Sequence, residues 1–303
     1  MSIEAPHSRD VLTDWRDSWW NRDFLALMAE RWRLGEVRRV LEVGSGLLHW
    51  TRALLPFLPE DATIVGVDKE QAWVEQGRAR AAERGLADRI ELRQGRADAL
   101  PVESGAYDLA TCQTVLMHVP DARAALREMI RAVRPGGLVA VAEPNNLAES
   151  VVRGTRFPPA SLEVLTALLR LEYYVHAGKA ARGHGDSSVG ERLPGLFAEA
   201  GLTDIRVYSS DKTATLIPPY DGPFDQLEIA QRRDFLEKGL LCSAGDRGNA
   251  EACFRAGGGP PEEFEALWAA AVADQHQMFD AISAGTFHTA GGIVFYLVSG
   301  RKV

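Results

Sequence analysis

The stretch Val40-Leu41-Glu42-Val43-Gly44-Ser45-Gly46-Leu47-Leu48-His49-Trp50 decides the fold of this 303-residue chain. An apolar, β-prone run breaks at two glycines, and residues 50–58 continue with a pattern typical of a helix. Glycine permits positive φ angles and lets a ligand approach the backbone closely. A strand, a glycine turn and a helix in this order are typical of the first unit of a nucleotide-binding α/β sheet, although a lone G-x-G is a weak signal.

Further β-prone runs alternate with predicted helices along the next hundred residues. The runs cover 63–67, 90–95, 107–112 and 138–143, and the helices cover 70–84 and 121–133. This alternation predicts a doubly wound α/β fold, a parallel sheet with helices on both faces. Ligands bind at the carboxyl ends of such strands, so polar residues there should meet in one crevice. These residues are Glu42, Asp68, Asp98, Gln113 and Glu143.

Two of these carboxylates have a specific expected role. Asp68 ends the second strand, where an acidic side chain can accept hydrogen bonds from both hydroxyls of a ribose. Glu42 precedes the glycines, and a carboxylate there suits a cationic or amine-bearing ligand better than a pyrophosphate. Asp108, by contrast, lies near the start of its strand and is expected to point away from the crevice.

Taken in order, these motifs resemble those of the class I S-adenosylmethionine-dependent methyltransferases, and the resemblance is specific over residues 38–145. The matching features are E-V-G-x-G at 42–46, Asp68, Asp98, the strand that begins Tyr107-Asp108, and the turn Pro135-Gly136-Gly137. The resemblance implies a seven-stranded, mostly parallel sheet of order 3-2-1-4-5-7-6, with strand 7 antiparallel. It implies S-adenosyl-L-methionine as the cofactor, with Asp98 near the adenine. The cofactor-binding residues it implies are Glu42, Gly44, Ser45, Gly46, Asp68, Lys69, Ala97, Asp98 and Gln113.

One position departs from the family pattern. The third glycine that usually follows two residues after the second is replaced by Leu48. This replacement predicts a bulkier loop near the methionine part of the cofactor.

The rest of the chain predicts two additions to this sheet. Residues 1–36 hold a Trp-rich amphipathic segment that we expect to form an N-terminal helical lid. Residues 37–211 and 291–303 are assigned to a Rossmann-like core. Residues 212–290 fall between the sixth and last strands, and they predict a helical cap that confers substrate selectivity, mediates dimerisation, or does both.

The leading interpretation is a methyltransferase that moves a methyl group, by in-line displacement, to an oxygen, nitrogen or carbon atom of a small molecule. Good alignment of the reacting atoms supplies much of the barrier lowering, so no catalytic dyad need be visible. If the acceptor must lose a proton, the candidate bases are His118, His176 and His184, and His118 is equally compatible with a structural role. Candidate substrate contacts are Trp19, Trp20, Glu143, Asn145 and Tyr174.

Two other functions stay open at this point. An NAD-dependent oxidoreductase on a Rossmann sheet fits Asp68 and the G-x-G turn. It is disfavoured by Glu42, by the position of Asp98 and by the Pro135-Gly136-Gly137 turn. A catalytically silent S-adenosylmethionine-binding partner protein would keep the ribose and adenine carboxylates without turnover.

Composition narrows the expected partners and location. The net charge of −8 and the lack of an Asn/Asp-Pro-Pro-Tyr/Phe signature after the fourth strand disfavour nucleic acid as a partner. The cysteines Cys112, Cys242 and Cys253 form no metal-ligand spacing, so we expect no metal and a reducing, cytoplasmic location. Residues 1–10 are polar and predict no signal peptide, and no membrane partner is expected. A homodimer formed through the cap is a further expectation.

Overall fold

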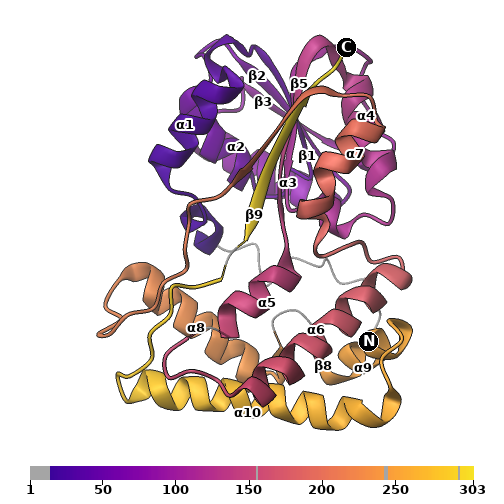
Figure 1. The fold of residues 1–303 in the computed structure, drawn as a ribbon. Coiled ribbons are helices and arrows are strands. Elements are labelled where there is room, and N and C mark those ends of the chain that lie inside the picture. Colours follow the sequence, from indigo (N-terminus) through magenta and orange to yellow (C-terminus); the bar gives the residue numbers. More distant parts are fainter. Residues whose placement is uncertain (1–13, 155, 242–244, 293) are drawn as a thin grey trace. The chain divides into compact units, whose positions relative to one another are not determined.

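A computed structural model describes residues 14–154, 156–241, 245–292 and 294–303 (Figure 1). The chain divides into two compact units. The sheet unit comprises Met1–Glu143, Gly190–Asp211 and Phe295–Val303, and the helical unit comprises Pro144–Val189 and Lys212–Val294. None of the helices in the described ranges is long and apolar enough to cross a membrane.

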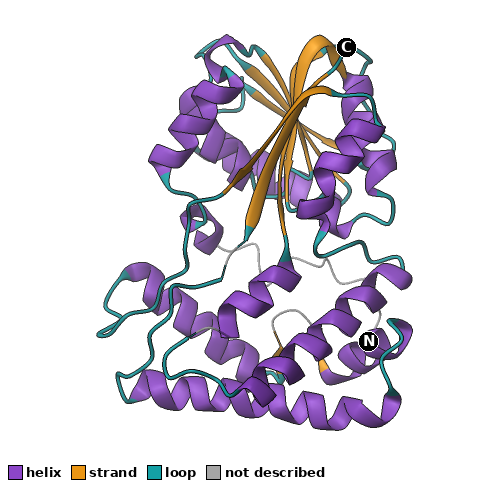
Figure 2. Ribbon diagram, viewed as in Figure 1, coloured by secondary structure: helices purple, strands orange, loops and turns teal. Residues whose placement is uncertain are grey.

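Seven strands of the sheet unit form one sheet in the order β3-β2-β1-β4-β5-β9-β6 (Figure 2). The strands are β1 Arg39–Val43, β2 Thr63–Asp68, β3 Ile90–Gln94, β4 Tyr107–Gln113, β5 Val133–Pro144, β6 Thr203–Ser209 and β9 Phe295–Arg301. The pairs from β3 to β5 are parallel, whereas β9 runs antiparallel to β6. The central strands β1, β4 and β5 are mostly buried because helices cover both faces of a parallel sheet, whereas the edge strand β6 is largely exposed. The fold class and the strand order predicted from the sequence are confirmed.

The helices of the sheet unit flank the strands on both sides (Figure 2). They are α1 Arg22–Trp32, α2 His49–Leu54, α3 Gln71–Glu83, α4 Ala122–Ala132 and α7 Leu193–Glu199. Short 3-10 segments are η1 Asp14–Ser18, η2 Leu34–Glu36, η3 Leu55–Phe57, η4 Leu116–His118 and η5 Val189–Arg192. Asp121 caps α4 by accepting a 3.0 Å hydrogen bond from the backbone N–H of Ala124. This is the expected way to satisfy a first-turn donor.

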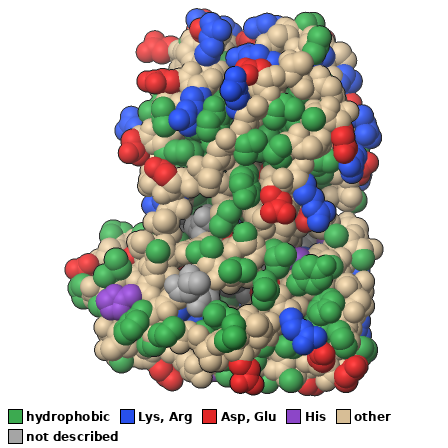
Figure 3. Space-filling view, viewed as in Figure 1, with side chains coloured by type: hydrophobic (Ala, Val, Ile, Leu, Met, Phe, Trp, Pro, Cys, Tyr) green, Lys and Arg blue, Asp and Glu red, His purple; other side chains and the backbone are tan. Residues whose placement is uncertain are grey.

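The helical unit is built from α5 Asn146–Gly154, α6 Leu162–Ala181, α8 Pro223–Glu237, α9 Arg247–Ala256 and α10 Phe264–Ser283. The segments η6 Pro261–Glu263, β7 Leu240–Leu241 and β8 Gly245–Asp246 connect them. α6 and α9 approach closely at Gly178, where an added Cβ would lie 1.7 Å from the carbonyl oxygen of Cys253. Figure 3 shows hydrophobic side chains gathered on one face of this unit. Exposed apolar residues of the unit include Phe157, Leu162, Tyr173, Ile217 and Leu227.

The structure corrects the expected division of the chain. Residues 144–189 were assigned to the Rossmann-like core, but they group with 212–294. The reason is that the apolar face of α6, with Leu171 and Val175, shares one buried cluster with Phe254 of α9 and Phe264 of α10. The cap is therefore assembled from two separate segments, and the sequence did not predict α9.

Candidate functional site

The glycine loop after β1 turns sharply and is tied to the end of β2. Gly44 and Gly46 have φ angles of 69° and 46°, and a Cβ added to Gly44 would lie 2.3 Å from a methyl group of Val115. The N–H of Gly44 donates to the carbonyl of Val67 (2.7 Å), and the N–H of Gly46 donates to Oδ2 of Asp68 (2.9 Å). Glycine is required here by both conformation and space.

Asp68 is held by backbone donors on both of its carboxylate oxygens. Besides the bond from Gly46, Oδ1 accepts a 3.0 Å hydrogen bond from the N–H of Glu70. Burial raises the pKa of Asp68 above its ordinary value. A carboxylate offers about four lone-pair sites, so the two oxygens retain the capacity to accept from a pair of ribose hydroxyls.

Glu42 lies beside Asp68 and is almost fully buried. The hydroxyl of Thr51 donates a hydrogen bond to Oε2 of Glu42. Burial, followed by the charge of Asp68, raises the pKa of Glu42 well above its ordinary value. Two carboxylates that repel each other in one crevice favour a ligand that carries positive charge.

Two polar atoms near these carboxylates have no hydrogen-bond partner within the described part of the chain. They are Oγ of Ser45, in the glycine loop, and Nε2 of Gln113, at the end of β4, and both are buried. A buried polar group without a partner costs free energy. A ligand with several hydrogen-bonding groups, such as the amino acid part of S-adenosylmethionine, therefore fits this crevice.

The expected adenine side of the site is more exposed. Asp98 follows β3, and both of its oxygens accept hydrogen bonds from Arg96, at 2.8 and 2.7 Å. These bonds lower the pKa of Asp98. Lys69 is exposed and lies 3.7 Å from a carboxylate oxygen of Glu70, and Ala97 is half-buried.

Glu143 was expected to contact the substrate, but the structure shows that its side chain supports the loop after β4 instead. Its side chain is fully buried, and Oε1 accepts hydrogen bonds of 2.8 Å from the N–H groups of both Val115 and Leu116. Oε2 accepts a 3.2 Å bond from the N–H of Met117. Burial raises the pKa of Glu143 to about 7. The carboxyl group thus fixes the loop after β4 and presents no exposed surface to a substrate.

The side chain of Leu48 was expected to make the glycine loop bulkier near the cofactor, but the structure places it elsewhere. The residue keeps the backbone conformation that a glycine would have, with φ 65° and ψ 27°. Its side chain is 1% exposed and belongs to the main core cluster of the sheet unit. The leucine therefore adds its bulk to the core and not to the open side of the loop.

The structure shows a cluster around η1 that the sequence did not predict. Oδ1 of Asp17 lies 2.7 Å from Nδ1 of His49 and 2.5 Å from a guanidinium nitrogen of Arg52, both on α2. On the same segment, Arg16 donates a 3.4 Å hydrogen bond to the hydroxyl of Thr114, directly after β4. Burial lowers the pKa of Arg16 to about 10, and burial also lowers the pKa of His49. The η1 segment is thereby fastened to α2 and to the residue that follows β4.

The tryptophans expected to contact substrate pack within the sheet unit. The ring of Trp19 lies 5.6 Å from that of Phe295, between centroids. The ring of Trp20 lies 5.2 Å from Trp50 and 5.5 Å from Phe295. Both tryptophans therefore have a packing role that connects the N-terminal segment to α2 and β9.

The candidate bases are divided between the two units. His118 is exposed at the end of η4 in the sheet unit. His176 and His184 belong to the helical unit: His176 is buried with Nε2 3.2 Å from Oε2 of Glu172, and His184 is half-buried after α6.

Two further candidate substrate contacts have local roles in the helical unit. Oδ1 of Asn145 accepts a 3.0 Å hydrogen bond from the N–H of Ala148 in the first turn of α5. The ring of Tyr174 packs 5.1 Å from that of Phe254 in the buried cluster between α6 and α9. Among the residues that the structure describes, no group of three or more His, Cys, Asp or Glu side chains is arranged to hold a metal ion.

Comparison with known proteins agrees with this geometry. Residues 40–137 match a family model described as a methyltransferase domain. The chain is 32% identical over 139 residues to an uncharacterized methyltransferase, YcgJ, of Bacillus subtilis (strain 168), a match that covers 45% of this chain and 53% of the relative. It is 26% identical over 174 residues to the ubiquinone/menaquinone biosynthesis C-methyltransferase UbiE of Yersinia pestis (strain Pestoides F), covering 55% of this chain and 67% of the relative. The chain thus spans about half of the first relative and two thirds of the second.

Solved structures show the same fold. The crystal structure of the Bacillus YcgJ protein has a TM-score of 0.51 at 18% identity, with 93% of this chain and 99% of that chain covered. A putative sarcosine dimethylglycine methyltransferase from Galdieria sulphuraria also has a TM-score of 0.51, at 16% identity, with 93% and 84% covered.

Proposed function

We propose that the chain binds S-adenosyl-L-methionine and methylates a small molecule, because residues 40–137 match a methyltransferase domain. The acceptor atom is an oxygen, a nitrogen or a carbon. The observation that carries the proposal is the joining of the glycine loop to Asp68 beside the buried carboxylate of Glu42. This arrangement offers acceptors for a ribose and negative charge for a cationic ligand.

Different residues of the sheet unit bind different parts of S-adenosylmethionine. Asp68 accepts from the ribose hydroxyls, and Asp98 accepts from the adenine amino group. Glu42 compensates positive charge on the amino acid part, and Ser45 and Gln113 gain the hydrogen-bond partners that they lack within the described residues. S-adenosylmethionine, when bound, supplies an electrophilic methyl group on a sulfonium.

The chain contributes alignment and the exclusion of water to the reaction. An acceptor held in line with the methyl group, about 3–3.5 Å away, gains much of its rate from orientation alone. The η1 segment, fastened by Asp17 to His49 and by Arg16 to Thr114, excludes water from the ends of β1 and β4. His118, on the exposed end of η4, is the candidate base in the sheet unit for an acceptor that must lose a proton.

The partners and the location are part of the same proposal. The net charge of −8 supports a small-molecule acceptor over nucleic acid. The exposed apolar residues of the helical unit, among them Ile217 and Leu227, support a homodimer formed through this unit. The cytoplasmic location rests on the cysteine content.

The test is incubation of the purified chain with methyl-labelled S-adenosylmethionine and fractionated small metabolites. We expect label in a small-molecule product from the wild type and little from Asp68→Ala. Binding of S-adenosylmethionine with no product from any metabolite fraction would support the silent partner protein instead.

A further inference from the structure

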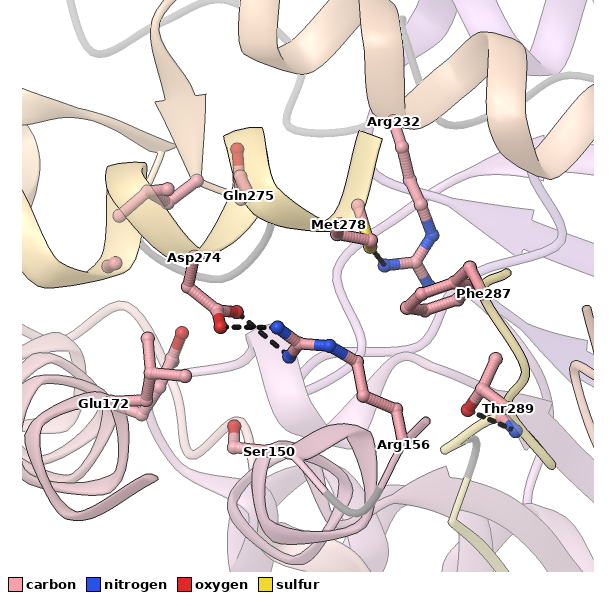
Figure 4. Close-up of a pocket in the computed structure, with 13 residues that line it drawn as sticks. Ser150, Arg156, Glu172, Arg232, Asp274, Gln275, Met278, Phe287 and Thr289 are labelled. Carbon is pink, nitrogen blue, oxygen red and sulfur yellow. Dashed lines mark hydrogen bonds and ion pairs between the residues drawn. The ribbon is translucent and has the colours of Figure 1, made fainter. Parts of the chain in front are cut away.

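A pocket lies within the helical unit, between α5, α6, α8 and α10 (Figure 4). Its volume is about 110 Å³. This volume is well above the minimum of about 10–15 Å³ for a single buried water, so the pocket has room for several waters or for a small organic molecule. The pocket therefore has the size of a binding site for a small molecule, and none of the residues placed in the cofactor site lines it.

Two arginines enter this pocket, and each already has a carboxylate partner. Arg156 donates through both terminal nitrogens to Asp274 of α10, at 3.0 and 2.5 Å (Figure 4). The two side chains are only 8% and 12% exposed. Arg232 donates through Nε to Oε1 of Glu228, one turn earlier on α8, at 2.6 Å. The positive charges that face the pocket are therefore balanced from within the protein.

The second carboxylate that lines the pocket, Glu172, is also near positive or polar groups. Oε2 of Glu172 lies 3.2 Å from Nε2 of His176. The charge of Glu172 also acts on Lys179, one turn further along α6, and opposes the lowering of its pKa by burial. An anionic ligand would meet arginines whose charges are already paired, and the burial of an unpaired charge is costly.

Two side chains that line the pocket, Arg156 and Ser150, can in contrast still form hydrogen bonds with a neutral ligand. A guanidinium has five N–H donors, and the bonds to Asp274 use two donors of Arg156. Ser150 of α5 donates its hydroxyl proton to the carbonyl of Asn146 at 2.9 Å, and its oxygen keeps lone pairs that accept. A ligand hydroxyl can therefore accept from Arg156 and donate to Ser150.

The remaining wall suits an apolar body. Met278 of α10 and Phe287 line the side of the pocket near Arg232, and Leu168 lines it from α6 (Figure 4). Met278 and Phe287 belong to one buried apolar cluster, so this wall is firmly packed. Burial of an aromatic or aliphatic surface against it is favourable in proportion to the area removed from water.

We propose that this pocket binds a small uncharged molecule that has an apolar body and a hydroxyl group, such as a phenol or a compact alcohol. The inference concerns the helical unit alone and does not depend on the proposed methyl transfer.

The first test compares three probes of similar size on the full chain, without cofactor, by ligand-detected NMR titration. Phenol has the hydroxyl, toluene lacks it, and benzoate carries a charge. We expect phenol to bind at least about fivefold more tightly than toluene, which is the difference in affinity that about one net hydrogen bond produces. We expect benzoate to bind more weakly than phenol. Equal affinity for phenol and toluene, or tightest binding of benzoate, overturns the proposal.

A blocking variant locates the binding. Ser150→Leu fills the pocket and removes an acceptor, so phenol affinity should fall about tenfold or more. Val151→Leu is the matched control on the same helix, because Val151 is exposed and does not line the pocket. Unchanged phenol binding by a folded Ser150→Leu variant contradicts the proposed location.

A charge variant tests the pairing argument independently. Asp274→Asn keeps the shape of the side chain but removes the charge opposite Arg156, so benzoate should bind this variant more tightly than it binds the wild type. Asp280→Asn, at an exposed position on the same helix, should leave the order of the three probes unchanged. If Asp274→Asn does not fold, Arg156→Met provides the converse test. This variant removes the positive charge opposite Asp274, so benzoate should bind it even more weakly than it binds the wild type. No change in benzoate affinity in either folded variant overturns the proposal.

Discussion

The backbone N–H of Gly46 donates a 2.9 Å hydrogen bond to Oδ2 of Asp68. This bond connects the glycine loop after β1 with the carboxyl end of β2, so the two segments of the crevice are positioned together. The neighbouring strands β1 and β4 mark the point where the strand order reverses. Ligands of doubly wound sheets bind at such a point.

Asp98 is predicted to contribute to cofactor affinity as a hydrogen-bond acceptor. Asp98→Ala should weaken S-adenosylhomocysteine binding about two- to tenfold, because a net hydrogen bond contributes about 0.5–1.5 kcal/mol. Asp98→Asn keeps an oxygen and should lose little. Arg96→Ala is the control, since it removes the ion pair at 2.7 Å but leaves the acceptor. If calorimetry gives both Asp98 variants the wild-type affinity, Asp98 is only a turn residue.

Glu42 should make cofactor affinity depend on pH. Its raised pKa means that a proton must leave before the carboxylate can compensate a positive ligand. S-adenosylmethionine affinity should therefore rise as the pH increases above the ordinary pKa of a glutamate, as long as the ammonium group of the ligand stays protonated. Glu42→Gln should bind more weakly and lose most of this rise, whereas Glu36→Gln, at an exposed position, should keep it. Parallel pH profiles for the wild type and Glu42→Gln would refute this role.

Leu48 provides a test on stability, since its positive φ and its buried side chain have opposite effects. Leu48→Ala should lower the free energy of unfolding by about 2–5 kcal/mol through lost burial. Leu48→Gly loses the same burial but relieves the left-handed conformation, which costs about 1–3 kcal/mol for a residue with a side chain. The glycine variant should therefore be about 1 kcal/mol more stable than the alanine variant.

The matched control is Leu54, the buried last residue of α2, which has an ordinary φ of −88°. There, alanine should be more stable than glycine by about 1 kcal/mol, as in most helices. Urea unfolding gives the free energy of unfolding of the alanine and glycine variants at both positions. The same order at both positions would show that the backbone at Leu48 is not strained.

Glu143 should lower the stability of the protein as pH rises toward neutrality. Below about pH 4.5 the carboxyl group is protonated in both the folded and the unfolded chain. Between about 4.5 and about 7 the unfolded chain releases the proton while the folded protein retains it, so the free energy of unfolding falls. The difference between the two pKa values corresponds to on the order of 3 kcal/mol.

The variant Glu143→Gln removes this contribution. Its absolute stability should be lower because an amide cannot accept from all three backbone donors of residues 115–117. Between pH 4.5 and 7, the free energy of unfolding of Glu143→Gln should nevertheless fall less steeply than that of the wild type. The control Glu60→Gln, at an exposed position, should fall as steeply as the wild type. Urea unfolding curves collected across this range give the comparison, and equal slopes would contradict the assignment.

The sheet was predictable because its signals are local. Most of its strands contain a short apolar run, and Gly44, Gly46 and Asp68 stand at the ends of such runs. The burial of Leu48 was not predictable, because nothing in the sequence shows that a leucine keeps a glycine-like φ. The pattern around the loop therefore predicted the glycine turn but not the direction of this side chain.

Contacts between distant residues account for the other differences. Asp17 and His49 are 32 positions apart, and their pairing depends on how η1 meets α2. Nothing in the sequence shows that Leu171 of α6 packs against Phe254 of α9 and not against the sheet. For Glu143, the position at a strand end was predicted correctly, while its three backbone donors come from a loop about 27 residues earlier.

Titration calorimetry of the full chain with S-adenosylhomocysteine and with NAD⁺ tests the cofactor site most directly. The wild type should bind S-adenosylhomocysteine and not NAD⁺. Asp68→Ala should bind S-adenosylhomocysteine about tenfold more weakly or worse, because losing a charged acceptor costs about 1.5–3 kcal/mol. Asp61→Ala, which removes only an exposed pair with Arg38 at 3.1 Å, should match the wild type. Unchanged affinity in a folded Asp68→Ala variant, or binding of NAD⁺ in place of S-adenosylhomocysteine, would contradict the assignment of Asp68 and of the crevice.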